Sequence, residues 1–247
     1  MIKNRFGFTL VEALITLGII GVIAGLTIPS AIAGRMATQA RAQFDTAYAI
    51  LNQTVADMIS DGVDLVGGRF IRARGSMYEQ FKSYMRVSID CGQAKAETVK
   101  ACSGGQTTNG YETFTGRPGA NVNWLIDDGS FVLHNGMLVG FENPEAGFGY
   151  PSISIDINGK TKPPNRWGWD MFTFQLMGED LLPVGAAGTR HAEDAGNAEF
   201  SFGANPDKWC DVNNISTATT SDKFNGITCA YKALEDEDYF KKIYRGR

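Results

Sequence analysis

Several residue types are scarce in this sequence, and each shortage narrows the range of functions. Only 2 of the 247 residues are histidines, and 23 lysines and arginines face 27 aspartates and glutamates, which gives a net charge of −4. A general nucleic-acid binder needs a basic surface, so we expect no nucleic-acid partner. Glycine and proline together make up 37 residues, about 15% of the chain, well below the roughly 25–30% that is typical of disorder.

Cysteine is also scarce. The four cysteines, Cys91, Cys102, Cys210 and Cys229, form no C-x-x-C pair, which argues against redox chemistry and against a zinc site. Four cysteines allow three disulfide connectivities, and the sequence does not choose among them. Each neighbouring pair frames its own polar loop. We therefore expect Cys91 to pair with Cys102 and Cys210 with Cys229, outside the cytoplasm, where disulfides are permitted.

A catalytic constellation is missing as well, so we expect no enzyme. The two histidines, His134 and His191, are far apart and have no evident nucleophile between them. No phosphate-binding loop or dinucleotide fingerprint is present. Tryptophans could form a ligand-binding surface, although strand aromatics more often pack in a core, as we expect for Trp124. The four tryptophans are Trp124, Trp167, Trp169 and Trp209.

One long apolar run stands out against this background. Residues 8–28 read FTLVEALITLGIIGVIAGLTI, and Glu12 is their only charged residue. A helix of this length spans roughly 31 Å at about 1.5 Å per residue, which matches the core of a bilayer. Lys3 and Arg5 precede the run. The positive-inside rule therefore places the N-terminus in the cytoplasm and the bulk of the chain outside an inner membrane.

Three interpretations of the run compete. A plain transmembrane anchor explains every feature except Glu12. A cleaved secretory signal would use Ala31-Ile32-Ala33, which has the small-x-small form of a cleavage site. Against that signal, the run exceeds the roughly 7–15 apolar residues that are usual, and it contains a carboxylate. The third interpretation rests on the residues that open the run.

Those residues are Gly7-Phe8-Thr9-Leu10-Val11-Glu12, with Pro29 further on. This stretch resembles the prepilin processing site of type IV pilins and type II secretion pseudopilins. The resemblance implies that a prepilin peptidase cuts after Gly7 and that the new N-terminal residue, Phe8, is methylated. It also implies that Glu12 acts in assembly. The partners would be other pilin-like subunits, an inner-membrane assembly platform and the lipid bilayer.

The electrostatic cost of a charge inside an apolar helix indicates that Glu12 has a function. A carboxylate inside an apolar helix costs on the order of 2.5–3.5 kcal/mol on insertion scales, so such a residue is usually functional. A cut after Gly7 would create an amino group on Phe8, four residues away and of opposite charge near neutral pH. The pair could form within one helix or between staggered helices of a fibre, where it would set the register.

The sequence predicts four parts: a leader (1–7), a transmembrane helix (8–28), a periplasmic continuation of that helix (29–61) and a globular head (62–247). Pro29 is expected to loosen the long helix without necessarily ending it, and Gly62 is a plausible stop. The continuation carries an apolar stripe at helical spacing. Its residues are Phe44, Tyr48, Leu51, Val55 and Met58.

The predicted fold class is α+β, with the long helix packed on an antiparallel sheet and a loop-rich, disulfide-bearing C-terminal region. Successive strands with short turns and no intervening helices favour an antiparallel meander. A short helix is expected from Ser76 to about Met85, followed by a polar loop with Cys91 and Cys102, and a terminal helix over 234–244. The strands are expected at 122–126, 130–133, 137–141, 152–157 and 171–176.

A partial calcium motif lies in the head. Asp156, Asn158 and Asp170 offer the oxygen ligands that calcium prefers, and some pseudopilins do hold calcium in the head. The EF-hand pattern fails, because Trp167 stands where its last acidic ligand belongs. The alternative is an Asn-Gly turn that leaves a strand, and we favour the turn. No other cofactor is expected.

The whole sequence favours a structural subunit of a type IV pilus or of a type II secretion pseudopilus. The alternative is a membrane-tethered or secreted extracytoplasmic binding protein whose head recognises a ligand.

Overall fold

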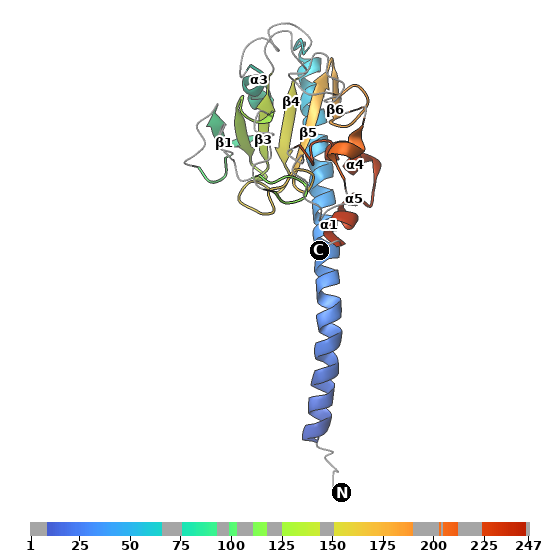
Figure 1. Ribbon diagram of the computed structural model, residues 1–247. Coiled ribbons are helices and arrows are strands. Elements are labelled where there is room, and N and C mark those ends of the chain that lie inside the picture. Colours follow the sequence, from blue (N-terminus) through green and yellow to red (C-terminus); the bar gives the residue numbers. More distant parts are fainter. Residues whose placement is uncertain are drawn as a thin grey trace.

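A long helix extends from one end of an α+β head (Figure 1). The computed structural model describes residues 9–65, 76–92, 99–102, 111–117, 125–143, 151–189, 203, 205–211 and 224–245. The elements in chain order are α1 (Leu10–Ser60), α3 (Ser76–Tyr84), β1 (Val87–Gly92), β2 (Ser130–Leu133), β3 (Leu138–Glu142), β4 (Ser152–Asp156), β5 (Met171–Met177), β6 (Asp180–Pro183), the 3-10 turn η5 (Pro206–Trp209), α4 (Cys229–Glu235) and α5 (Tyr239–Arg245).

Helix α1 is continuous over 51 residues, a length of about 77 Å at 1.5 Å per residue. It includes Pro29, which does not end it. The helix ends at Ser60 with Asp61 as its C-cap, and Gly62 follows as the predicted stop. Gly62 has a φ of 75°, and its N–H donates to the Ile59 carbonyl over 3.0 Å while the Val63 N–H donates to the Met58 carbonyl over 2.9 Å. This pair of bonds is a Schellman cap, which needs a residue in the left-handed region.

The second half of α1 packs on the head through the predicted stripe. Tyr48 is only half-buried, but its ring stacks on Phe174 with 5.4 Å between ring centres. Small residues that the sequence analysis did not single out extend the stripe, and they let other elements approach the helix closely. The buried residues of α1 are Ala37, Ala40, Phe44, Ala47, Leu51, Thr54, Val55 and Met58.

The six strands form one antiparallel sheet in the order β1 to β6, which confirms the predicted meander. Strands β2 to β5 lie where the sequence placed them, to within about a residue at each end. Strands β1 and β6 were not predicted, and β1 contains Cys91, which had been assigned to a loop. The predicted strand over 122–126 is wrong for Leu125 and Ile126, which lie in a turn. Its other residues fall outside the described ranges.

Both faces of the sheet are covered. Ile153, Ile155 and Ile157 share one face, as predicted, and belong to the core that includes the buried stripe of α1. Ser154, on the opposite face, is also fully buried, and its hydroxyl lies 3.0 Å from that of Thr173. A second apolar cluster covers that face. It consists of Cys91, Cys102, Tyr111, Leu125, Ile126, Val132, Leu138, Trp167, Met171, Val184, Trp209 and Ile227.

The C-terminal region forms two short helices, α4 and α5, where one was expected over 234–244. Disulfides join Cys91 to Cys102 and Cys210 to Cys229, the local pairing that was predicted. The second bridge links the residue after η5 to the first residue of α4, and both of its cysteines are buried. It therefore holds this region against the core.

Candidate functional site

The first half of α1 presents an apolar surface that the head does not cover. By length and composition, α1 is long and apolar enough to cross a membrane. Leu10 is 77% exposed and Leu26 is 75% exposed. Exposure of so many large apolar side chains to water is unfavourable. This half of the helix therefore needs a bilayer or other apolar helices around it. The secretory cleavage site suggested at 31–33 lies inside the same helix.

Glu12 lies in the first turn of α1 and forms a capping box with Thr9. The Glu12 N–H donates to Thr9 Oγ1 over 3.3 Å. In return, Glu12 Oε2 accepts the Thr9 N–H over 2.9 Å and the Thr9 hydroxyl over 2.8 Å. The sequence analysis missed Thr9, although Thr9-Leu-Val-Glu12 before an apolar run has the form of a capping box.

The cap matters because a helix start leaves backbone N–H groups without partners, and a bilayer offers none. Glu12 thus has a local role in this structure besides the predicted role in assembly, which stays a prediction. Gly7 and Phe8, the predicted processing residues, lie outside the described residues.

In the head, the structure brings Asp156, Asn158 and Asp170 together. Asp156 Oδ1 accepts the N–H groups of Asn158 and Gly159 over 3.2 and 2.8 Å, and its Oδ2 accepts the Tyr111 hydroxyl over 2.6 Å. The side-chain amide of Asn158 donates through Nδ2 to Asp170 Oδ2 over 3.4 Å. Tyr111 had not been singled out, because it lies 45 positions before Asp156.

The second carboxylate of this cluster, that of Asp170, also accepts hydrogen bonds from the backbone. Asp170 accepts the backbone N–H groups of Asn165 over 2.7 Å and of Arg166 over 2.6 Å. Lys160 lies close by, with its ammonium 3.7 Å from the centre of the Tyr111 ring. Backbone N–H groups and the Tyr111 hydroxyl therefore already occupy carboxylate oxygens that a calcium ion would need as ligands, and Lys160 adds a positive charge nearby. This arrangement supports the turn over the metal site. Calcium binding at Asp156, Asn158 and Asp170 stays a prediction.

Burial perturbs the titration of these groups. It raises the pKa of Asp156 to about 6, against the lowering effect of the bonds from Tyr111 and the backbone. Burial and then the Asp156 charge raise the pKa of Asp170 well above its usual value. Burial lowers the pKa of Lys160, while both carboxylates act to raise it. The folded state thus holds a proton on the two carboxylates more tightly than the unfolded chain does, and a proton on Lys160 less tightly.

The cluster predicts a pH dependence of stability. Because the folded-state pKa of Asp156 lies above the unfolded value near 3.8, the free energy of unfolding should fall as pH rises from about 4 to 6. In Asp156→Asn the fall should be smaller, and above pH 6 this variant should be more stable than the wild type by roughly 1–3 kcal/mol. Urea unfolding at several pH values measures this.

Asp180→Asn, at an exposed carboxylate on β6, is the matched control and should keep the wild-type slope. An unchanged slope in Asp156→Asn would contradict the burial argument. The calcium alternative makes a different prediction. Millimolar calcium, compared with a chelator, should raise the unfolding midpoint of the wild type and not that of Asp156→Asn.

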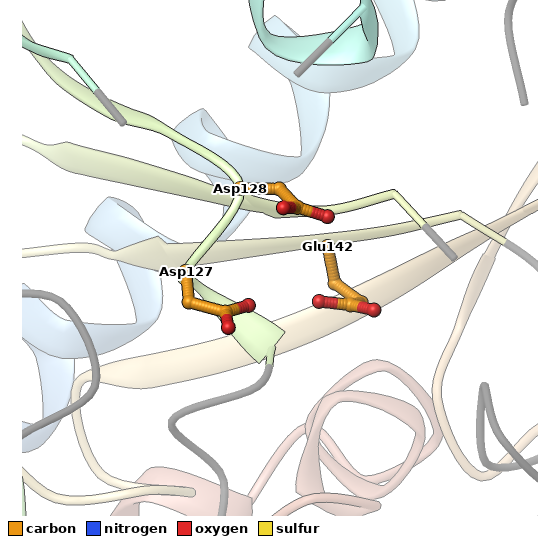
Figure 2. Close-up of side chains that lie close together, drawn as sticks. All are labelled: Asp127, Asp128 and Glu142. Carbon is orange, nitrogen blue, oxygen red and sulfur yellow. The ribbon is translucent and has the colours of Figure 1, made fainter. Parts of the chain in front are cut away.

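A second acidic cluster was not predicted. Asp127, Asp128 and Glu142 each place a carboxylate oxygen within 4.8 Å of the others, as Figure 2 shows. The two aspartates lie between the predicted strands at 122–126 and 130–133. The segment before β2 pairs with the end of β3, where the Asp128 N–H donates to the carbonyl of Phe141 over 3.0 Å. This pairing brings Glu142 beside the two aspartates. The Asp128 carboxylate also accepts the Asn143 N–H over 2.9 Å.

The remaining candidate residues lie where a structural role explains them. Trp167 and Trp169 are each 1% exposed, and Trp209 is buried as well, so these three do not form a ligand-binding surface. His134 lies at the end of β2, with Nδ1 3.1 Å from the Arg86 carbonyl oxygen. Trp124 and His191 fall outside the described residues.

Comparison with known proteins identifies the N-terminal segment. Residues 2–28 match the family model described as the prokaryotic N-terminal methylation motif, which is the signature of the type IV pilin and pseudopilin family. No match to the chain was found among curated proteins or among solved structures. The motif thus covers the segment that includes Gly7, Phe8 and Glu12 and reaches almost to Pro29.

Proposed function

We propose that this chain, which carries the N-terminal methylation signature of the type IV pilin and pseudopilin family, is a structural subunit of a pilus or pseudopilus fibre. It is cut after Gly7 by a prepilin peptidase, methylated on Phe8, and held in the inner membrane by the apolar half of α1 with its head outside. It then leaves the bilayer and assembles with other pilin-like subunits.

The observation that carries this proposal is the exposed half of α1 together with the motif at its start. A folded head with a sheet packed on one half of a helix leaves the other half free to exchange lipid for neighbouring helices. The family to which the motif belongs is structural and not enzymatic. The two disulfides support an extracytoplasmic head, since such bonds persist in oxidising compartments.

Processing is the most direct test. In the native membrane, mass spectrometry should find a mature chain that begins at methylated Phe8, and Gly7→Val should leave the full-length chain, since a side chain at Gly7 would obstruct the peptidase. Gly18→Val is the matched control. A Cβ at this position meets nothing within 4 Å in this structure, and Gly18 lies eleven residues beyond the cut, so cleavage should be unaffected. A mature chain that begins at Gly34, or Gly7→Val that is still shortened by seven residues, would contradict the proposal.

A further inference from the structure

The end of the head nearest the apolar span is formed by α5 (Tyr239–Arg245), and we call it the foot of the head. It lies against the part of α1 that follows the apolar span. Helix α5 runs antiparallel to α1 toward that span. Near its start, Glu237, Phe240 and Lys241 line a groove with residues between Ala37 and Asp45. Near its end, Tyr244 lines an apolar notch of about 330 Å³ with residues between Ile28 and Met36. The end of α5 thus lies at the membrane side of the head (Figure 1).

The length of the apolar span determines how deep this notch lies relative to the bilayer. A hydrocarbon core about 30 Å thick takes up about 20 helical residues, and headgroups add several ångströms on each side. If residues 8–28 fill the core, the next two turns of α1 lie among headgroups. Ile32 and Met36 are in these turns and stay exposed at 54% and 37%. The notch therefore opens at the boundary between acyl chains and headgroups.

Two arginines are direct sequence neighbours of residues that line the notch, since Arg35 precedes Met36 and Arg245 follows Tyr244. Arg35, the first charged residue after Glu12, is exposed on α1, and Arg245 is exposed at the end of α5. Lys241 and Lys242 are also exposed on α5. An arginine guanidinium binds a phosphate in a bidentate manner, and long basic side chains can reach it while their apolar stems stay against the protein.

The acidic residues of this region lie at the other end of α5. Asp236 and Asp238 precede the helix and pair with Lys242 and Lys241. These ion pairs are exposed and therefore weak. The groove beside Ala37 to Asp45 therefore carries charges of both signs, from Arg41, Asp45, Glu237 and Lys241, whereas α5 itself, which leads toward the membrane, contains no acidic residue.

We propose that the foot of the head is a binding site for anionic phospholipid. The phosphate lies between Arg35 and Arg245, and the upper part of the acyl chain occupies the notch beside Tyr244. The site seats the head on the outer surface of the bilayer while the subunit waits in the membrane. This inference rests on the proposed function, because it needs α1 to span the bilayer.

The test uses the full chain reconstituted in nanodiscs that contain photoactivatable phosphatidylglycerol or phosphatidylcholine, with the reactive group near the glycerol. Mass spectrometry then measures lipid cross-linked to the peptide that contains α5 and, separately, to the apolar half of α1. We expect several-fold more labelling of α5 by phosphatidylglycerol, and a loss of this excess at high salt.

The variant Arg35→Gln with Arg245→Gln should lose this several-fold excess, so that phosphatidylglycerol labels α5 about as much as phosphatidylcholine does. The control is Lys82→Gln with Arg86→Gln, which removes the same charge. Lys82 is on α3, and Arg86 lines a groove with residues 46–57 of α1, at least ten residues beyond Met36 and about 15 Å further from the membrane. This control should label like the wild type.

Labelling of α5 that is equal for both lipids, or that both pairs of substitutions reduce alike, would overturn the inference. Labelling of α1 without labelling of α5 would overturn it while leaving the membrane-spanning part of the proposed function intact. Failure to label α1 would overturn both.

Discussion

Replacing Glu12 by leucine is expected to abolish or nearly abolish incorporation of the subunit into fibres, while membrane abundance stays normal or rises. The substitution removes a charge from an apolar helix, so residence in the bilayer should improve. In a fibre, however, the amino group of Phe8 on a neighbouring subunit would lose its partner. Leaving a buried charge unpaired costs about 3–5 kcal/mol, which corresponds to a fall of more than about a hundredfold in the assembly equilibrium.

The measurement is the ratio of subunit in sheared fibres to subunit in the membrane. The capping box requires a control, since Glu12 also holds the N-terminus of α1 through Thr9. Thr9→Ala removes the hydroxyl side of the cap and keeps the charge, so it should destabilise only the first turn, by about 1 kcal/mol, and still assemble. Glu12→Asp should be milder than leucine because the charge is retained. An unchanged fibre-to-membrane ratio in Glu12→Leu would contradict the assembly role.

Replacing Phe44 by alanine is expected to lower the free energy of unfolding of the head by about 3–5 kcal/mol. Phe44 is fully buried, and its ring lies 4.7 Å from that of Phe172 and 5.7 Å from that of Phe240 between ring centres. It therefore joins α1, β5 and α5 at one point. Its loss leaves a cavity that three separate elements would have to move to fill.

Denaturant unfolding of the full chain in detergent measures this change. Gln39→Ala, at an exposed position little more than one turn earlier on α1, is the control and should change stability by less than about 0.5 kcal/mol. Phe44→Leu should fall between the two, because most of the volume is kept. A loss below about 1 kcal/mol in Phe44→Ala would show that α1 contributes little to the folding of the head.

Features that depend on neighbours in sequence were predictable. The apolar run and the stripe around Phe44 repeat at helical spacing, so they define α1 without knowledge of what covers it. Gly62 ends that helix because the left-handed conformation of its cap favours glycine. The alternation of isoleucines in β4 marked its core face, since side chains alternate along a strand. Gly7 to Glu12 carried the family resemblance for the same reason, as one short continuous segment.

Features that depend on distant pairing were decided only by the tertiary structure. Strands β1 and β6 lack a clear alternating pattern and are strands because β2 and β5 supply their hydrogen bonds. Asp128 meets Glu142 only because the segment before β2 pairs with the end of β3, and Tyr111 meets Asp156 only because its segment covers the sheet. By itself the sequence determined the long helix, its processing motif and the order of the central strands, because these are local patterns. The tertiary structure decided which polar residues are buried together and where α5 lies, because such contacts follow from the packing of distant segments.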